Sequence, residues 1–205
     1  MNADWEGYYT ALEGRAARRL LLETLALIST SKQGSPRRVA IDLGCGDGTE
    51  TRELLARGWN VVAIDKTPQA IARVRASVPA EDCPRLTAIA AAFTDIELPP
   101  ADLIYAGLSL PFCDPDSFGE LWPRISVAVR EDGWFAGHFF GPRDSWVGRV
   151  DMTFLSREQV CALLTDFRIE GYQEQDEDGD SFAGRKHWHV FHVIAHKVRS
   201  PARAN

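Results

Sequence analysis

Short apolar runs alternate with stretches of helical periodicity through the middle of the chain. Five of these runs are expected to be β-strands, at residues 39–43, 60–64, 86–90, 102–106 and 134–138. Helices are expected near residues 48–57, 68–77, 115–129 and 156–165. This alternation is typical of βα units that build a parallel sheet with helices on both faces. The pattern therefore predicts a doubly wound, Rossmann-like α/β fold.

The two ends of the chain differ from this pattern. Apolar residues recur at helical spacing over residues 5–31, and a glycine- and proline-containing cluster follows at 31–36. Residues 167–173 and 188–195 are expected to form an antiparallel hairpin joined by an acidic, glycine-bearing turn. We expect one domain over residues 1–205, with 1–34 as an amino-terminal helical lid segment, 35–198 as the sheet core and 199–205 as a tail.

Composition narrows the classes of partner. Hydrophobic residues make up 45% of the 205 residues, enough for one sizeable core. Acidic residues outnumber basic ones by 29 to 23 and no basic stripe occurs, which argues against a nucleic-acid partner. Neither a secretory signal nor a membrane span is evident, so we expect a cytoplasmic monomer or homodimer. Cys45, Cys83, Cys113 and Cys161 form no C-x-x-C pair, and we expect them to be reduced thiols.

A glycine-rich loop follows the first expected strand and opens the next helix. It contains Gly44, Gly46 and Gly48, so a ligand can approach bare backbone at a helix amino terminus. The spacing G-x-G-x-G differs from the dinucleotide fingerprint G-x-G-x-x-G, because the third glycine comes one residue too early. Asp42 and Asp47 would repel a pyrophosphate but not a cationic ligand.

Asp65 ends the second strand, about 20 residues beyond the glycine loop, where a carboxylate can accept both hydroxyls of a ribose. A glycine turn alone is an ordinary connection, and a lone strand-end carboxylate is often only solvated. Both features in the right strand order favour a nucleoside-binding site.

The loop from Asp42 to Gly48, followed by Val62-Ala-Ile-Asp65, resembles motifs I and II of class I S-adenosylmethionine-dependent methyltransferases. That resemblance implies a seven-stranded sheet of order 3-2-1-4-5-7-6 with strand 7 antiparallel. It implies that Gly44 and Gly46 pass under the methionine part of the cofactor and that Asp65 holds the ribose. We expect Asp42, Cys45 and Lys66 to contact the cofactor as well.

A narrower resemblance is to small bacterial enzymes related to the tellurite-resistance methyltransferase. It rests on Trp5-Glu-Gly-Tyr-Tyr9, Ser109-Leu-Pro-Phe-Cys113 and Arg143-Asp-Ser-Trp146. These segments do not define a substrate.

The sequence departs from the usual family pattern after the third strand. Ala92 occupies the position where many members have an acidic residue that binds the adenine amino group. We expect adenine to meet the backbone N–H and ring of Phe93 and the stem of Lys66. The alternative is that Asp95 reaches the base, although a turn residue before Pro99 is the simpler role for it.

In this family the loop after the fourth strand faces the transferred methyl group, which implies a place there for Leu108, Ser109 and Phe112. Ligands of open α/β sheets bind at the carboxyl ends of strands, an independent reason for the same location. The alternative is that this segment only turns the chain into the next helix.

The amino-terminal segment offers two kinds of cofactor contact. Tyr8 and Tyr9 can cover the sulfonium as a lid, with Tyr9 the one we expect to bind, although either aromatic could simply pack the helix on the sheet. Arg15 and Arg18 could meet the cofactor carboxylate, and we expect Arg18 to do so; solvated arginines are the plainer alternative.

Methyl transfer from a sulfonium is an in-line displacement, so the protein must chiefly align donor and acceptor. A hydroxyl or ammonium acceptor needs a general base, for which His138 and Asp144 are the candidates by position. A thiolate, selenide or telluride acceptor needs none.

Metal binding is not expected. His187 and His189 share one strand face while His192 falls on the other, and no cysteine or carboxylate completes a set at ligand spacing along the sequence. The acidic segment that begins at Asp176 resembles a calcium loop but lacks its glycine and its twelfth-position glutamate, so a solvated hairpin turn is expected.

We therefore expect S-adenosylmethionine-dependent methyl transfer to a small-molecule acceptor. Three alternatives remain. An aminopropyl transferase is disfavoured because no acidic cluster follows the fourth strand. A dinucleotide oxidoreductase is disfavoured by the position of Gly48. A non-catalytic cofactor-binding or partner-binding module is compatible with an intact loop, because the loop indicates binding rather than turnover.

Overall fold

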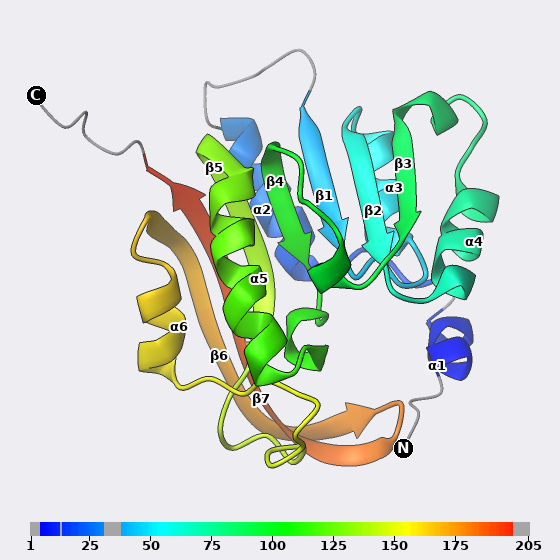
Figure 1. Cartoon of the computed structure of the whole chain (residues 1–205). Coiled ribbons are helices and arrows are strands. Elements are labelled where there is room, and N and C mark those ends of the chain that lie inside the picture. The colour runs from blue at the N-terminus through cyan, green and yellow to red at the C-terminus, as the bar shows by residue number, and fades with distance from the viewer. Residues whose placement is uncertain (1–4, 13, 31–37, 199–205) are drawn as a thin grey trace, which may run out of the picture.

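A computed structural model describes residues 5–12, 14–30 and 38–198 of the chain. Its seven-stranded sheet has the order β3-β2-β1-β4-β5-β7-β6, which confirms the fold expected from the sequence (Figure 1). The strands are β1 (Val39–Leu43), β2 (Asn60–Asp65), β3 (Leu86–Ala90), β4 (Ala101–Ala106), β5 (Val129–Phe140), β6 (Phe167–Ser181) and β7 (Gly184–Lys197). The first five strands pair in parallel, and β7 is antiparallel to both β5 and β6.

Helices cover both faces of the sheet. They are α1 (Trp5–Ala11), α2 (Arg19–Thr30), α3 (Thr49–Ala56), α4 (Pro68–Ser77), α5 (Pro115–Ala128) and α6 (Arg157–Leu163). Apolar residues of α5 and α6 form the core on one face, and those of α2, α3 and α4 form the core on the other. In Figure 1, α5 and α6 lie in front of the sheet and α2 lies behind it.

The central strands are buried on both faces, which explains their continuous apolar sequences. Ala40, Ile41, Leu103 and Ile104 are fully inaccessible to solvent. Parallel strands covered by helices on both sides need apolar residues at every position. The chain passes from β1 to β2 on one side, then returns through β3 to β4 on the other. The carboxyl ends of β1 and β4 therefore flank the topological switch point, where open α/β sheets bind ligands.

The expectation of continuous helical periodicity over residues 5–31 is wrong between the two amino-terminal helices. Gly14 adopts a left-handed backbone with φ 79°, and the chain is not helical from there to Arg18. Glycine adopts this conformation without the steric cost that other residues bear. The break lets Arg15 turn toward α3, as described below.

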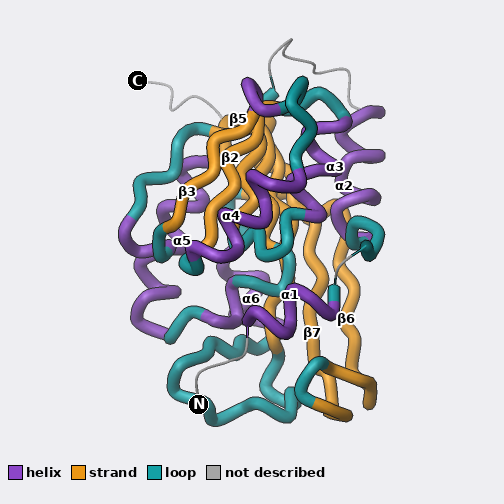
Figure 2. Tube along the Cα trace, turned by 90° about the vertical axis from the view of Figure 1, so that its right-hand side faces the viewer, coloured by secondary structure: helices purple, strands orange, loops and turns teal. Residues whose placement is uncertain are grey.

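The expected acidic turn of the hairpin is also wrong. β6 and β7 stay paired from Phe167–Lys197 out to Ser181–Gly184, so the acidic residues are strand residues. Cross-strand pairing explains this, because Asp176 lies opposite His189 and Asp180 lies opposite Arg185. Figure 2 shows the hairpin continuing beyond the ends of the other strands.

Some expectations fall on residues that the structure does not describe. These are the breaker cluster at 31–36, the tail at 199–205 and the first four residues of the lid segment. Within the described residues, no helix is both long and apolar enough to cross a membrane.

Candidate active site

A cavity of about 280 Å³ opens at the carboxyl ends of β1, β2 and β4. Most of the residues proposed from the sequence line it: Tyr9, Arg18, Gly44, Cys45, Gly46, Asp65, Lys66, Ala92, Phe93, Leu108, Ser109 and Phe112. Segments from five parts of the chain thus meet in one place. Asp42, His138 and Asp144 do not line the cavity.

Asp65 ties the end of β2 to the glycine loop. Its Oδ2 accepts the Gly46 N–H at 3.1 Å, while its Oδ1 accepts the backbone N–H and the hydroxyl of Thr67 at 2.9 and 2.6 Å. A carboxylate has about four acceptor sites in total, so these bonds fix its orientation and leave capacity for a ligand hydroxyl. Asp65 is thereby held at the cavity wall.

Side chains from other parts of the chain lie very close to the backbone of the glycine loop. A Cβ atom on Gly44 would come within 2.2 Å of the Ser109 Cβ and 3.3 Å of the Phe93 ring, and one on Gly46 would come within 3.1 Å of the Tyr9 ring. Both glycines have positive φ, 81° and 52°. The loop therefore needs glycine for its backbone conformation as well as for the close approach. This bare-backbone cradle beside a fixed carboxylate fits an adenosyl amino acid.

Asp42, which the sequence analysis placed in contact with the cofactor, lies beneath the loop and does not line the cavity. Its carboxylate is buried and accepts a hydrogen bond from the Thr51 hydroxyl at 2.6 Å. Burial, followed by the negative charge of Glu50, raises the pKa of Asp42 to about 7. Its contact with α3 supports the start of that helix.

Arg15 forms an ion-pair network that the sequence did not reveal. Its guanidinium donates to Glu50 Oε1 at 2.6 Å and to Asp47 Oδ1 at 3.1 Å. The backbone N–H of Arg18 donates to the same Glu50 oxygen at 3.1 Å. Burial opposes ionisation of Glu50, but Arg15 outweighs it and holds the pKa of this carboxyl below its usual value. The network fastens the segment after α1 to the glycine-loop end of α3.

Sequence reasoning also missed lining residues on the loops after β3 and β4 and in the first turn of α5. Thr94, Gly107, Cys113, Asp114 and Ser117 contribute to the cavity. The Asp114 side chain caps α5 by accepting the Ser117 N–H at 3.0 Å. Burial, followed by Asp114, raises the pKa of the Cys113 thiol to about 11, so this thiol is protonated at neutral pH. A helix-cap signal before α5 was the available clue.

His138, a base proposed from the sequence, does not line the cavity and supports its wall from behind. Its ring is 4% exposed, and its Nδ1 accepts the Leu108 N–H at 3.2 Å. Burial, followed by the neighbouring His192, holds the pKa of His138 well below its usual value. Leu108 has a left-handed φ of 58°, so the neutral imidazole holds a strained backbone position.

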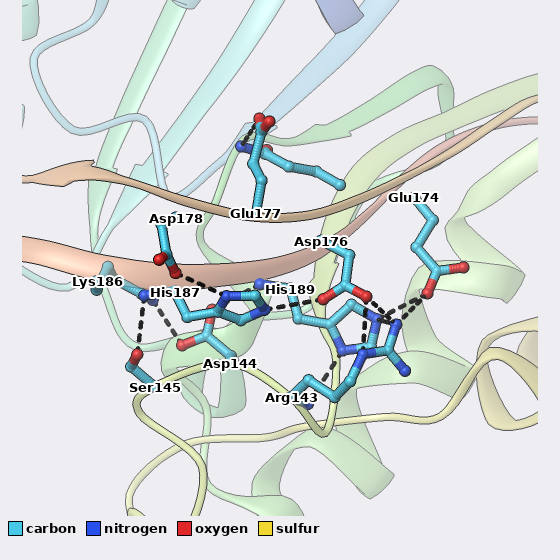
Figure 3. Close-up of polar contacts among 11 residues, drawn as sticks. Arg143, Asp144, Ser145, Glu174, Asp176, Glu177, Asp178, Lys186, His187 and His189 are labelled. Carbon is cyan, nitrogen blue, oxygen red and sulfur yellow. Dashed lines mark hydrogen bonds and ion pairs between the residues drawn. The ribbon is translucent and has the colours of Figure 1, made fainter.

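Asp144, the second base proposed from the sequence, belongs to a buried ion pair and does not line the cavity (Figure 3). Its Oδ1 accepts from the Lys186 ammonium at 2.6 Å and from the Trp146 N–H at 3.0 Å. The Lys186 nitrogen lies 3.6 Å from the centroid of the Trp146 ring and 4.0 Å from that of Trp188. Asp144 therefore anchors the loop after β5 to the hairpin.

The hairpin brings together a polar cluster that sequence spacing did not predict. Ligand-type atoms of Glu174, Asp176 and His189 lie within 4.8 Å of one another, because the carboxylates come from the paired strand β6. The guanidinium of Arg143 lies among them, with ion pairs of 2.8 Å to Glu174 and 2.6 Å to Asp176 (Figure 3). The positive charge in this cluster is thus supplied by an arginine.

Residues 40–133 match a family model described as a methyltransferase domain. This segment spans the glycine loop, Asp65, and the loop from Leu108 to Phe112. No curated protein matches the chain in sequence.

Several solved structures share the fold. TehB from Haemophilus influenzae has a TM-score of 0.71 at 14% identity, over 94% of this chain and 67% of that one. The 1,6-didemethyltoxoflavin-N1-methyltransferase of Burkholderia thailandensis, with bound 1,6-didemethyltoxoflavin and S-adenosylhomocysteine, has a TM-score of 0.68 at 20% identity, over 95% and 83%. An O-methyltransferase family 2 protein of Planctomyces limnophilus, in complex with apigenin, has a TM-score of 0.63 at 18% identity, over 95% and 62%.

The match of residues 40–133 to the methyltransferase-domain model and the sheet order agree with the class inferred from the glycine loop, that of S-adenosylmethionine-dependent methyltransferases. The narrower resemblance is confirmed in the fold, because this chain is similar in structure to TehB, the tellurite-resistance methyltransferase.

Proposed function

We propose that the protein transfers a methyl group from S-adenosylmethionine to a small-molecule acceptor by in-line displacement in this cavity. The observation that carries the proposal is the Asp65 carboxylate, bonded to the Gly46 N–H at 3.1 Å and exposed to a cavity floored by glycine. We also propose that the chain is one domain, because both core clusters pack on the same sheet.

Each part of the cavity wall has a proposed role toward the cofactor. The backbone of Gly44, Cys45 and Gly46 lies under the methionine part, and Asp65 accepts from the ribose hydroxyls with Lys66 alongside. Ala92 and Phe93 border the adenine, while Tyr9 and Arg18 cover the cofactor from the amino-terminal segment. Asp95, the alternative adenine ligand, is exposed and does not line the cavity. When bound, S-adenosylmethionine supplies the electrophilic methyl group.

The acceptor is proposed to lie against Leu108, Ser109 and Phe112. His138 holds the Leu108 backbone, and the Ser109 hydroxyl donates to the Leu43 carbonyl, so two loops are locked together at this end. Among the described residues, no histidine lines the cavity. An acceptor whose nucleophilic lone pair needs no base, such as an aromatic nitrogen or a thiolate-like atom, would not require a histidine here.

Small-molecule acceptors are supported by the size of the cavity and by the neighbours. A volume of about 280 Å³ is close to the lower end of the range for small-ligand pockets. Structures with this fold contain 1,6-didemethyltoxoflavin or apigenin. Both compounds are small ring systems, and the aromatic wall at Phe112 suits such a shape.

Calorimetric titration with S-adenosylhomocysteine and with NADH tests the proposal. Wild-type protein is expected to bind the adenosyl ligand selectively, and Asp65→Ala to bind it at least about tenfold more weakly, because hydrogen bonds to a charged group are lost. Asp95→Ala, which removes a nearby carboxylate outside the cavity, is the matched control and is expected to bind like wild type. Preference for NADH, or equal affinity in Asp65→Ala, would refute the assignment.

A further inference from the structure

The short turn that carries Phe112 is held by a residue from a distant part of the chain. Phe112 lines the cavity and ends the 3₁₀ turn Leu110–Phe112. The backbone N–H of Thr153 donates to the carbonyl of Pro111 at 3.0 Å, and the Thr153 hydroxyl donates to the carbonyl of Cys113 at 2.9 Å. One threonine thus bonds the residues on both sides of Phe112.

Thr153 belongs to a segment that is fixed to the end of β5. The residue is buried, with 6% of its surface exposed. Just beyond it, the Leu155 N–H donates to the Phe140 carbonyl at 2.8 Å, and Phe154 forms an isolated parallel bridge with Phe140. Phe140 is the last residue of β5. The sheet therefore supports Thr153, and Thr153 supports the turn.

The ring of Phe112 has its own support from the same loop. Its centroid lies 6.2 Å from that of Trp146 and 6.2 Å from that of Phe140. Trp146 is held in turn by the Lys186 ammonium, 3.6 Å from the ring centroid, and by the bond from its backbone N–H to Asp144. The loop after β5 therefore contacts both the side chain of Phe112 and the backbone around it.

We propose that Thr153 is a positioning residue for methyl transfer, because its bonds to the carbonyls on either side of Phe112 fix the ring that bounds the transferred group and the acceptor. Thr153 does not line the cavity, so it acts on a ligand only through Phe112. An in-line displacement depends on the alignment of donor and acceptor, to which a fixed wall contributes. This inference rests on the proposed function, which places the acceptor against Phe112.

Fluorine NMR tests whether Thr153 fixes the ring. Thr153→Val has nearly the same shape, loses the hydroxyl bond to Cys113 and keeps the N–H bond to Pro111. With para-fluorophenylalanine in place of Phe112 and saturating S-adenosylhomocysteine, the otherwise wild-type protein is expected to give one narrow resonance. Thr153→Val is expected to shift or broaden it, and Thr153→Ser, which keeps the hydroxyl, to restore it. An unchanged resonance in Thr153→Val would overturn the inference.

The consequence for the reaction is measured with S-adenosylethionine, whose ethyl group extends one carbon farther from the sulfur than the methyl group does. Wild type is expected to bind this analogue at least about tenfold more weakly than S-adenosylmethionine, as for one extra methylene in a fixed apolar pocket. In Thr153→Val the ratio of the two Kd values is expected to fall to about threefold or less, with the Kd for S-adenosylmethionine unchanged. An unchanged ratio, or equal affinities in wild type, would show that Phe112 is not a fixed boundary of the transferred group.

Thr24→Val is the matched control. Thr24 on α2 is also buried, its hydroxyl donates to the Leu20 carbonyl at 2.7 Å, and it does not line the cavity. This control is expected to keep the wild-type resonance and the wild-type ratio of Kd values. If it changes both as much as Thr153→Val does, the inference is wrong.

Urea unfolding establishes that each variant is folded. If Thr153→Val is not, Thr153→Ala takes its place, because alanine also lacks the hydroxyl and puts no apolar methyl group beside the Cys113 carbonyl. When the Thr153 variants behave like wild type, the inference fails while the proposed function stands. If wild type binds neither S-adenosylmethionine nor S-adenosylhomocysteine, both fail.

Discussion

Gly44 and Ser109 meet so closely that a side chain on the first would occupy the space of the second. A Cβ on Gly44 would be 2.2 Å from the Ser109 Cβ, and the Ser109 hydroxyl donates to the carbonyl of Leu43, the residue before this glycine. The loops after β1 and β4 are thus in direct contact at the floor of the cavity. This contact joins the proposed cofactor site to the proposed acceptor site.

Gly44→Ala is expected to lower the free energy of unfolding by about 2–4 kcal/mol, from left-handed backbone strain plus overpacking, and to abolish measurable binding of S-adenosylhomocysteine. Urea unfolding and calorimetry measure the two effects. Gly148→Ala is the control for backbone strain alone, because Gly148 has φ 91° and nothing within 4 Å of a Cβ. Adding Ser109→Gly to Gly44→Ala should recover part of the stability; no recovery would contradict the clash.

Asp42 is expected to make stability depend on pH in an unusual direction. Its pKa is raised to about 7 in the folded protein, against about 3.9 in an unfolded chain, so the folded state binds the proton more tightly. Its contribution to stability is therefore fully present below pH ~4 and is lost as the pH rises toward 7, by at most about 1.4 kcal/mol per pH unit.

Asp42→Asn isolates this effect, because asparagine can still accept the Thr51 hydrogen bond and cannot ionise. The variant is expected to gain stability relative to wild type as the pH rises from 4 to 7, with a constant difference above that. The opposite contribution of Glu50, whose pKa is lowered, is present in both proteins and cancels to first order. Urea unfolding at pH 5 and at pH 8 gives the difference in the free energy of unfolding between wild type and Asp42→Asn at each pH. Equal differences would show that Asp42 does not titrate in this range.

Removing one partner of the Lys186–Asp144 pair is expected to lower the free energy of unfolding strongly, whereas replacing both partners with apolar residues is expected to change it little. The side chains are 4% and 0% exposed, so Lys186→Met leaves a buried unpaired carboxylate and is expected to lower the free energy of unfolding by about 3–5 kcal/mol. Combining Lys186→Met with Asp144→Leu should restore most of that loss, because two apolar side chains can replace a buried pair.

Arg143→Met serves as the control for this pair, because Arg143 is 54% exposed and its ion pairs are on the surface. It is expected to change the free energy of unfolding by no more than about 1 kcal/mol. Chemical denaturation of the three variants and of wild type gives the comparison. If the double variant is no more stable than Lys186→Met, the expectation that two apolar side chains can replace the buried pair is wrong.

The strands of the sheet and the glycine loop were predictable because their signals are local. Largely apolar runs such as 39–43 coincide with β1, since a strand buried on both faces favours apolar residues on both of them. The bounds of α4 were also predicted, with Pro68 at its first turn. The hairpin was predicted too short, because its polar outer part is stabilised by cross-strand charges that appear only when β6 and β7 are paired.

The sequence by itself determined the class of site: three glycines at positive φ and Asp65 at the end of the next strand are specified within one βα unit and its neighbour. Tertiary structure alone decided which other side chains reach that site. Arg15 binds Glu50, which is 35 positions away in the sequence, and this pair lines the cavity. Asp144 binds Lys186, which is 42 positions away, and this pair does not line it. Such partners are set by the sheet order, which brings distant segments together by closing long loops rather than by any local pattern.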